Sequence, residues 1–217
     1  MTEKDQTQMK IRVISLDATG TIVNDHYLDF VWLEVVPKLY AEKRNISLAS
    51  AKGFVNQEYD RMSKDDIRWY LPEYWFKHFQ LDRNPMDVFK EHKDLIEIYP
   101  EVPSVLETLS KEYDLIVASG LPKNLLEIAL EDVRTYFRHT FSPVTDLGEV
   151  GKSVGFYNMI CKTLDIKPQD MLHIGDNWDN DYAIPRKFGM MSLFLDRTGK
   201  RKGKYIVKNL REVTKYL

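Results

Sequence analysis

Apolar residues along this chain follow two patterns, which alternate over most of its length. Short, mostly apolar runs end near Gly, Ser or Asp, as is typical of buried strands in a parallel sheet. Between these runs, apolar residues recur at helical spacing. The predicted strands are 13–16, 115–118, 140–141, 171–174 and 191–194, the predicted helices are 102–111, 123–130, 154–164 and 181–188, and 205–217 predicts a short strand and a closing helix. This alternation favours an α/β fold whose parallel sheet is covered on both faces.

One long segment departs from the alternation, because residues 24–97 contain little strand signal. Its apolar spacing predicts four helices, at 27–42, 48–62, 67–79 and 85–95. Asn84 followed by Pro85 is a typical helix start. We therefore expect two domains, an α/β core made of residues 1–23 and 99–217 and an inserted all-helical domain at 24–98.

Asp17 follows the first predicted strand directly, and small or hydroxylated residues come next. Open α/β sheets bind ligands at the carboxyl ends of their strands. Gly20 permits a tight turn and the close approach of a ligand to the main chain, and Thr19 adds a hydroxyl. A carboxylate held at such a turn can attack a phosphorus or carbon centre. An Asp that only caps the turn is the simpler alternative.

Two further segments carry groups that suit an anionic oxygen. Ser119 and Gly120 end the strand 115–118 just before a helix, where a hydroxyl and free amides can bind an anion. A serine that caps the helix is the alternative. Lys152 lies after two glycines and before the helix 154–164, and it supplies a compact positive charge, although most lysines are solvated.

The fourth segment is acidic. Asp176 ends the strand 171–174 after a glycine, and Asp181 follows it closely. Clustered carboxylates repel one another unless a cation lies among them, and oxygen ligands of this kind suit Mg²⁺. A solvated acidic loop is the alternative reading.

Together, these four segments resemble the motifs of the haloacid dehalogenase superfamily, whose phosphatases carry them in this order. The resemblance extends from about Lys10 to Leu217 and implies a Rossmann-like three-layer core with a helical cap. It also implies that Asp17 is the nucleophile and that Ser119 and Lys152 bind the transferred phosphoryl group, with Thr19, Gly20 and Gly120 in the same substrate site. The implied Mg²⁺ ligands are Asp17, the backbone carbonyl of Thr19, Asp176 and Asp181, the last of which otherwise orients the lysine.

Thr19 departs from the family pattern, because most of its phosphatases carry a second Asp there as general acid and base. A hydroxyl does not serve as an acid–base group near neutral pH, and such catalysis contributes about 10²- to 10⁴-fold. We therefore expect slow protonation of the leaving group, slow hydrolysis of an aspartyl-phosphate, or both. The motif is similar to that of cation-pumping ATPases, but the chain has no apolar run of membrane-spanning length.

Three functions follow from this interpretation. The first is a Mg²⁺-dependent phosphatase of a small phosphorylated metabolite, acting through an aspartyl-phosphate. The second is a metal-free 2-haloacid dehalogenase, in which the same Asp17 attacks carbon and no second Asp is needed. Asp176 weighs against it, because a second anion would repel both nucleophile and substrate. The third is a Mg²⁺-binding protein of this fold with little turnover, for which Thr19 is the support.

The composition of the chain limits the classes of binding partner that we expect. A formal net charge of −2, from 31 basic and 33 acidic residues, gives no reason to expect nucleic acid or an anionic membrane as a partner. The single cysteine, Cys161, rules out an internal disulfide, and Met1–Met9 are too polar for a signal peptide. We expect a cytoplasmic monomer or homodimer with a small phosphorylated substrate. The basic run 197–204 predicts a solvated loop.

The inserted helices carry an aromatic cluster, which includes Trp69, Tyr70, Trp75 and Phe79. We interpret it mainly as packing within the helical domain. Alternatively Trp69, Tyr70 or Arg68 faces the catalytic cleft and selects the leaving group.

Overall fold

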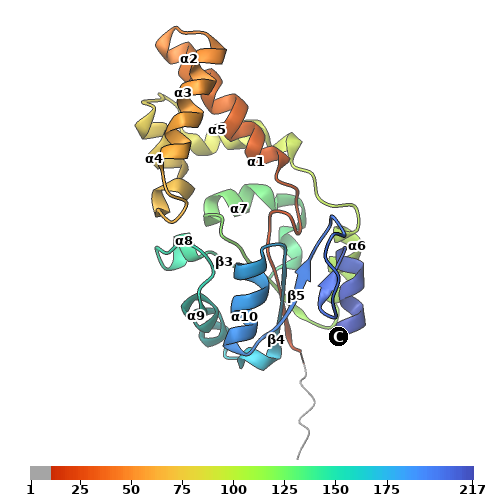
Figure 1. The fold of residues 1–217 in the computed structure, drawn as a ribbon. Coiled ribbons are helices and arrows are strands. Elements are labelled where there is room, and N and C mark those ends of the chain that lie inside the picture. The colour runs from red at the N-terminus through yellow and green to blue at the C-terminus, as the bar shows by residue number, and fades with distance from the viewer. Residues whose placement is uncertain (1–10) are drawn as a thin grey trace, which may run out of the picture.

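Six parallel strands form a single sheet in the order β3-β2-β1-β4-β5-β6 (Figure 1). The structure is a computed structural model and describes residues 11–217, so the expectation for residues 1–9 lies outside it. The strands are β1 (Val13–Leu16), β2 (Asp114–Ala118), β3 (His139–Phe141), β4 (Met171–Gly175), β5 (Met191–Leu195) and β6 (Ile206–Val207). All five strands predicted in the core are present, and β6 matches the short strand expected near the C-terminus.

Helices cover both faces of this sheet, as the sequence predicts. On one face, alternate strand residues such as Ile14 and Leu16 pack against α6, α7 and two 3₁₀ segments. On the other face, Val13 and Ile116 pack against α9 and α10. The covering elements are α6 (Val102–Leu109), α7 (Lys123–Ala129), α9 (Val154–Leu164), α10 (Ile184–Phe188) and the 3₁₀ segments Glu131–Tyr136 and Leu210–Tyr216. The core is therefore the expected three-layer α/β structure.

The inserted segment forms a helical cap, which lies over α7 in Figure 1. It comprises α1 (His26–Phe30), a π-helical segment (Val31–Val35) that continues into α2 (Val36–Arg44), α3 (Leu48–Arg61), a 3₁₀ turn (Ile67–Tyr70), α4 (Pro72–His78), α5 (Pro85–Glu91) and a 3₁₀ turn (Lys93–Leu95). The cap has its own apolar core, and Leu125 and Ile128 of α7 pack into it. Its two connections to the sheet run side by side, with Val23 bridged to Ile98.

The prediction of one helix over 67–79 is wrong, because the chain is extended at Leu71. Pro72 is the first residue of α4, and its ring disfavours helical geometry in the residue before it. Leu71 accordingly has φ −101° and ψ 107°. The break turns the short segment Ile67–Tyr70 toward the core. A short helix, α8 (Pro143–Asp146), also occurs where none was expected.

No helix within residues 11–217 has the length and apolar character needed to cross a membrane.

Candidate active site

The candidate residues meet because three neighbouring strands end at the same edge of the sheet. Asp17 follows β1, Ser119 follows β2 and Asp176 follows β4, and β1 lies between the other two. A cavity of about 220 Å³ at this edge is lined by Asp17, Thr19, Tyr70, Ser119, Gly120, Leu121, Gly151, Lys152, Asp176, Asn177, Asn180 and Asp181. Gly20 is the one nominated residue that does not line it.

Lys152 occupies the middle of the charged groups. Its ammonium donates to Asp17 Oδ1 at 2.8 Å and to Asp181 Oδ1 at 2.5 Å. The lysine side chain is only 4% exposed, so both contacts form away from bulk water. Ser153, the next residue, caps α9 through its hydroxyl, which accepts from the amide of Phe156. The cap of the helix therefore fixes the chain direction just where Lys152 enters the cavity.

Three groups hold the carboxylate of Asp181 in place through hydrogen bonds. It accepts from Lys152, from the amide of Asn177 at 2.9 Å and from His173 Nε2 at 3.1 Å. Burial lowers the pKa of His173, which is therefore neutral. Since a carboxylate can only accept, Nε2 carries the proton and Nδ1 accepts from the hydroxyl of Ser15 at 2.8 Å.

The three carboxylates differ in their charge balance. Burial works against ionisation of Asp181, but the charge of Lys152 and the hydrogen bond from His173 outweigh it and hold the pKa of Asp181 well below its usual range. Burial, with the charge of Asp181 in addition, raises the pKa of Asp17 despite the opposing effect of Lys152. Partial burial and the charges of Asp17 and Asp181 raise the pKa of Asp176 to about 7. Lys152 thus compensates the charge of Asp181 well, whereas Asp17 and Asp176 still lack sufficient positive charge.

A divalent cation fits this arrangement. Ligand oxygens of Asp17, Asp176 and Asp181 lie within 4.8 Å of one another. Both oxygens of Asp181 accept bonds from the protein, whereas Asp176 is exposed to the cavity and receives no side-chain partner among the described residues. Asp17 and Asp176 are therefore the carboxylates best placed to hold a hard cation such as Mg²⁺, which prefers oxygen ligands, and Thr19 lines the same cavity.

Hydrogen-bond donors also line the cavity. Ser119 is 1% exposed, and within the described chain the amides of Thr19 and Gly120 donate to no protein acceptor. Ser119 does not cap α7, whose N-cap is Pro122. Unsatisfied amides and a hydroxyl around one small space are suited to the oxygens of a phosphoryl group.

Two glycines leave space for the carboxylates of Asp181 and Asp176. A Cβ on Gly175 would lie 2.3 Å from Asp181 Oδ2 and 2.7 Å from its Cβ. Gly20 has φ +71°, and a Cβ there would lie 2.1 Å from Asp176 Oδ2. Gly20 thus provides the expected tight turn, and the group that comes close to its main chain is Asp176.

Arg197 joins the far side of the Asp17 loop to the core. Its guanidinium donates to the carbonyls of Gly20 at 3.0 Å and Thr21 at 2.7 Å and to Glu101 at 2.7 Å. It also lies 3.4 Å from the ring centre of Tyr99. The prediction of a solvated basic loop at 197–204 is therefore wrong for Arg197, whose side chain is 18% exposed.

Sequence reasoning missed His173 and Arg197, and it left Tyr70 as one of three alternatives. A histidine inside the strand that ends at Asp176 is the signal that could have indicated the first of these. Tyr70 lines the cavity that contains Asp17, whereas Arg68 is turned to Asp66 and the ring of Tyr74.

The family of the chain follows from a sequence comparison. A family model described as haloacid dehalogenase-like hydrolase matches residues 11–189. The chain belongs to this family. It is accordingly a hydrolase with the fold that the motif resemblance implied. Among curated proteins, none matches the sequence.

Solved structures of haloacid dehalogenase-like proteins share the whole fold. A phosphatase of this family from Thermococcus onnurineus is 23% identical, with a TM-score of 0.82 over 95% of this chain and 97% of that one. A 2-haloacid dehalogenase from Pseudomonas syringae pv. Tomato DC3000 is 18% identical, with a TM-score of 0.69 over 94% and 97%. A magnesium-bound hydrolase from Bacillus subtilis is 16% identical, with a TM-score of 0.65 over 96% and 99%.

The substitution Gly175→Ala tests the packing against Asp181. The added methyl would collide with a fixed, buried carboxylate, so we expect the free energy of unfolding to fall by about 1–3 kcal/mol in urea titrations. Gly53→Ala is the matched control, since nothing lies within 4 Å of its Cβ and it stands inside α3. That control should raise stability by up to about 1 kcal/mol. Equal stability of Gly175→Ala and wild type would contradict this account.

The Arg197–Glu101 pair predicts a non-additive pair of substitutions. Arg197→Met leaves a largely buried Glu101 without its positively charged partner and should cost about 3 kcal/mol, as is usual when one member of a buried pair is removed. Adding Glu101→Gln should recover much of this loss, because no charge then remains. A double-mutant cycle in urea measures the coupling, and a coupling near zero would refute the pairing.

The same pair predicts a loss of stability in acid. Burial alone raises the pKa of Glu101, but the hydrogen bond and charge of Arg197 outweigh it and hold the pKa below the ordinary 4.5. A lowered folded-state pKa stabilises the fold above about pH 4.5, and this contribution is lost as pH falls through the folded-state value. The pH dependence of unfolding should therefore be shallower below pH 4.5 in Glu101→Gln than in wild type.

Proposed function

We propose that this hydrolase is a Mg²⁺-dependent phosphatase of a small phosphorylated metabolite, with Asp17 as nucleophile. The observation that carries the proposal is Asp176, an unpaired carboxylate next to Asp17 in the same cavity, with a pKa raised to about 7. Two carboxylates in excess of one lysine favour a site that works with a divalent cation. Mg²⁺ bound there would neutralise charge on the phosphoryl oxygens.

The surrounding residues can perform both chemical steps. An Asp17 oxygen would attack phosphorus while the bond from phosphorus to the ester oxygen breaks. Lys152, Ser119 and the amides of Thr19 and Gly120 would stabilise the equatorial oxygens, which is how proteins contribute most to phosphoryl transfer. Water would then attack the aspartyl-phosphate, releasing phosphate and restoring Asp17.

The leaving oxygen would take its proton from water. Apart from Asp17, Asp176 and Asp181, no carboxylate of the described chain lines the cavity, and Thr19 offers only a hydroxyl. Tyr70 is a poor acid, because burial raises its pKa above the ordinary 10.0. The proposed enzyme is therefore slow on esters whose leaving group needs a proton.

A metal-free 2-haloacid dehalogenase is the second candidate, favoured by Thr19 and by the fold of the Pseudomonas syringae dehalogenase. The unpaired Asp176 opposes it, since without a cation it would repel both Asp17 and a carboxylate substrate. The Thermococcus onnurineus phosphatase and the magnesium-bound Bacillus subtilis hydrolase support the first candidate in the same way, by fold.

A phosphoester panel with and without Mg²⁺ tests the proposal. We expect phosphate release that requires Mg²⁺, stops in EDTA and falls to background in Asp17→Asn. Asp179→Asn is the matched control, because Asp179 is exposed and does not line the cavity, and it should keep its activity. Halide release from 2-haloacids that persists in EDTA would instead establish the dehalogenase. Absence of both activities would leave the fold with little turnover, the third hypothesis.

Thr19→Asp tests the missing acid–base group. With a proton donor restored, turnover of alkyl phosphates should rise by about 10-fold, the low end of what such catalysis contributes. The gain should be smaller for p-nitrophenyl phosphate, whose leaving group departs without a proton. Rates are compared at saturating Mg²⁺, because the added carboxylate also changes the charge near Asp176. Lower turnover on every ester, with fold and Mg²⁺ binding intact, would show that the acid–base explanation is wrong.

A further inference from the structure

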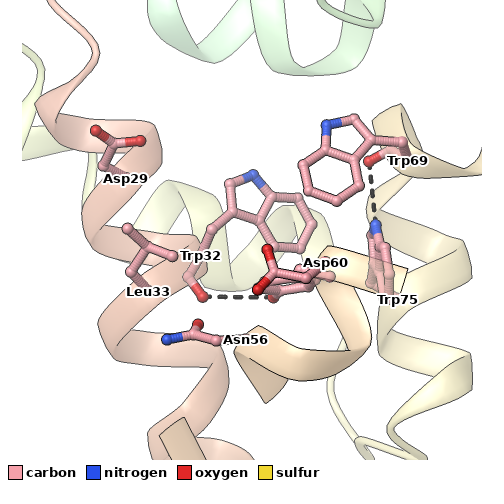
Figure 2. A pocket seen from close by; sticks show the side chains of 8 residues that line it. Asp29, Trp32, Leu33, Asn56, Asp60, Trp69 and Trp75 are labelled. Atoms are coloured by element: carbon pink, nitrogen blue, oxygen red, sulfur yellow. Dashed lines mark hydrogen bonds between the residues drawn. The ribbon is translucent and has the colours of Figure 1, made fainter. Parts of the chain in front are cut away.

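The cap contains a second and larger cavity, of about 450 Å³, which the catalytic mechanism does not use (Figure 2). Its walls come from α1 and the π-helical segment after it, from the end of α3, from the 3₁₀ turn Ile67–Tyr70 and from α4. Aromatic rings and carboxylates line it together, and Trp32, Trp69, Trp75 and Asp60 are labelled in the close-up.

The aromatic rings form a rigid wall around Tyr59. The rings of Trp32, Trp69 and Trp75 each stand nearly perpendicular to it, with ring centres 6.0, 6.0 and 4.7 Å away. Trp75 donates its indole N–H to the carbonyl of Trp69 at 3.0 Å, and the hydroxyl of Tyr59 donates to the carbonyl of Trp32 at 3.4 Å. These bonds fix the rings of Trp75 and Tyr59, against which the rings of Trp32 and Trp69 pack.

The carboxylates of this cavity lack basic partners. Asp29 and Asp60 line it and are exposed, and neither forms an ion pair within the described chain. The ammonium of Lys64 lies 5.7 Å from the ring centre of Trp69, so one cation of the chain already lies near this ring. Aromatic faces beside carboxylates are the surroundings that bind organic ammonium groups.

Two consecutive residues of the chain line the cap cavity and the catalytic cavity. Trp69 lines the first and Tyr70 lines the second, on the same 3₁₀ turn. A ligand with a phosphoryl group at Asp17 can therefore extend its other end toward the cap.

We propose that the cap cavity binds the ammonium end of the substrate, so that the enzyme prefers phosphomonoesters of amino or trimethylammonium alcohols. The proposal rests on the proposed phosphatase function and narrows its substrate class. The phosphoryl group would occupy the catalytic cavity, and the cation would lie against Trp32 and Trp69, with Asp29 and Asp60 balancing its charge.

Matched pairs of esters test the preference for a cation. Choline phosphate is compared with 3,3-dimethylbutyl phosphate, which has the same shape without the charge, and 2-aminoethyl phosphate is compared with propyl phosphate. We expect kcat/KM to be at least about 10-fold higher for the charged member, the discrimination that a cation–π contact with the indole rings and the nearby carboxylates together supply. Chains of increasing methylene number locate the optimum length.

The outcomes separate the two proposals. Hydrolysis of p-nitrophenyl phosphate with equal rates for charged and neutral alkyl esters would refute the cation site and leave the phosphatase intact. No Mg²⁺-dependent hydrolysis of any ester would refute the phosphatase. In that event the cavity is still tested by binding alone, as follows.

Intrinsic fluorescence measures binding without chemistry, because three of the four tryptophans line the cap cavity. In a Trp178→Phe background, choline should change the emission in a saturable way, whereas neutral 3,3-dimethylbutanol should bind at least about 10-fold more weakly. Indistinguishable titrations of the two compounds would refute the site.

Charge-removing variants locate the site within the cap. Asp60→Asn and Asp29→Asn should each lower the charged-to-neutral ratio of kcat/KM, and each should weaken choline binding by about 3- to 10-fold. Glu42→Gln is the matched control, an exposed cap carboxylate that lines neither cavity, and it should leave the ratio unchanged. A ratio that responds equally to all three variants would mean that only the net charge of the cap matters, which would refute the site.

Discussion

The site depends on one ammonium group shared by two carboxylates. Lys152 bridges Asp17 and Asp181 in a place that is almost closed to water. Removing one member of a buried charged group leaves the others uncompensated, which destabilises a fold more than the intact group stabilises it. The loops that follow β1 and β4 and the loop that precedes α9 are therefore held together by the same side chains that the proposed chemistry uses.

Asp181 connects the charged groups of the site to the β-sheet. His173 lies directly opposite Ser15 in the register of β4 and β1, and both are fully buried. Their hydrogen bonds form a continuous polar chain from the middle of the sheet to Lys152. A buried network whose members are all satisfied favours a single arrangement over alternatives. This arrangement also requires glycine at position 175, because any Cβ there would occupy the space of Asp181.

Much of the core and of its site was predictable because the deciding signals are local. Apolar runs marked the strands, and the rule that strand ends meet at one edge brought Asp17, Ser119 and Asp176 together. Arg197 was not predictable in this way, because only the folded chain brings Tyr99 and Glu101 beside it. The break at Leu71 had a local signal in Pro72, but helical apolar spacing continues through it and concealed the turn. The orientation of Tyr70 depended on that turn.

The cap and the core act on different parts of the proposed reaction. Contacts in the cap cavity lie away from the bond that breaks, so they stabilise the bound ester and its transition state equally. In the proposed reaction they would select which ester binds and would not accelerate its cleavage. Thr19 would affect the rate of cleavage instead of binding. Because Thr19 supplies no proton donor, the barrier for cleavage of a bound ester is higher, whereas the affinity for the ester is unchanged. An enzyme built in this way would gain selectivity from the aromatic rings and carboxylates of the cap. Its rate would be limited because the residue beside Asp17, Thr19, offers a hydroxyl in place of a carboxylic acid.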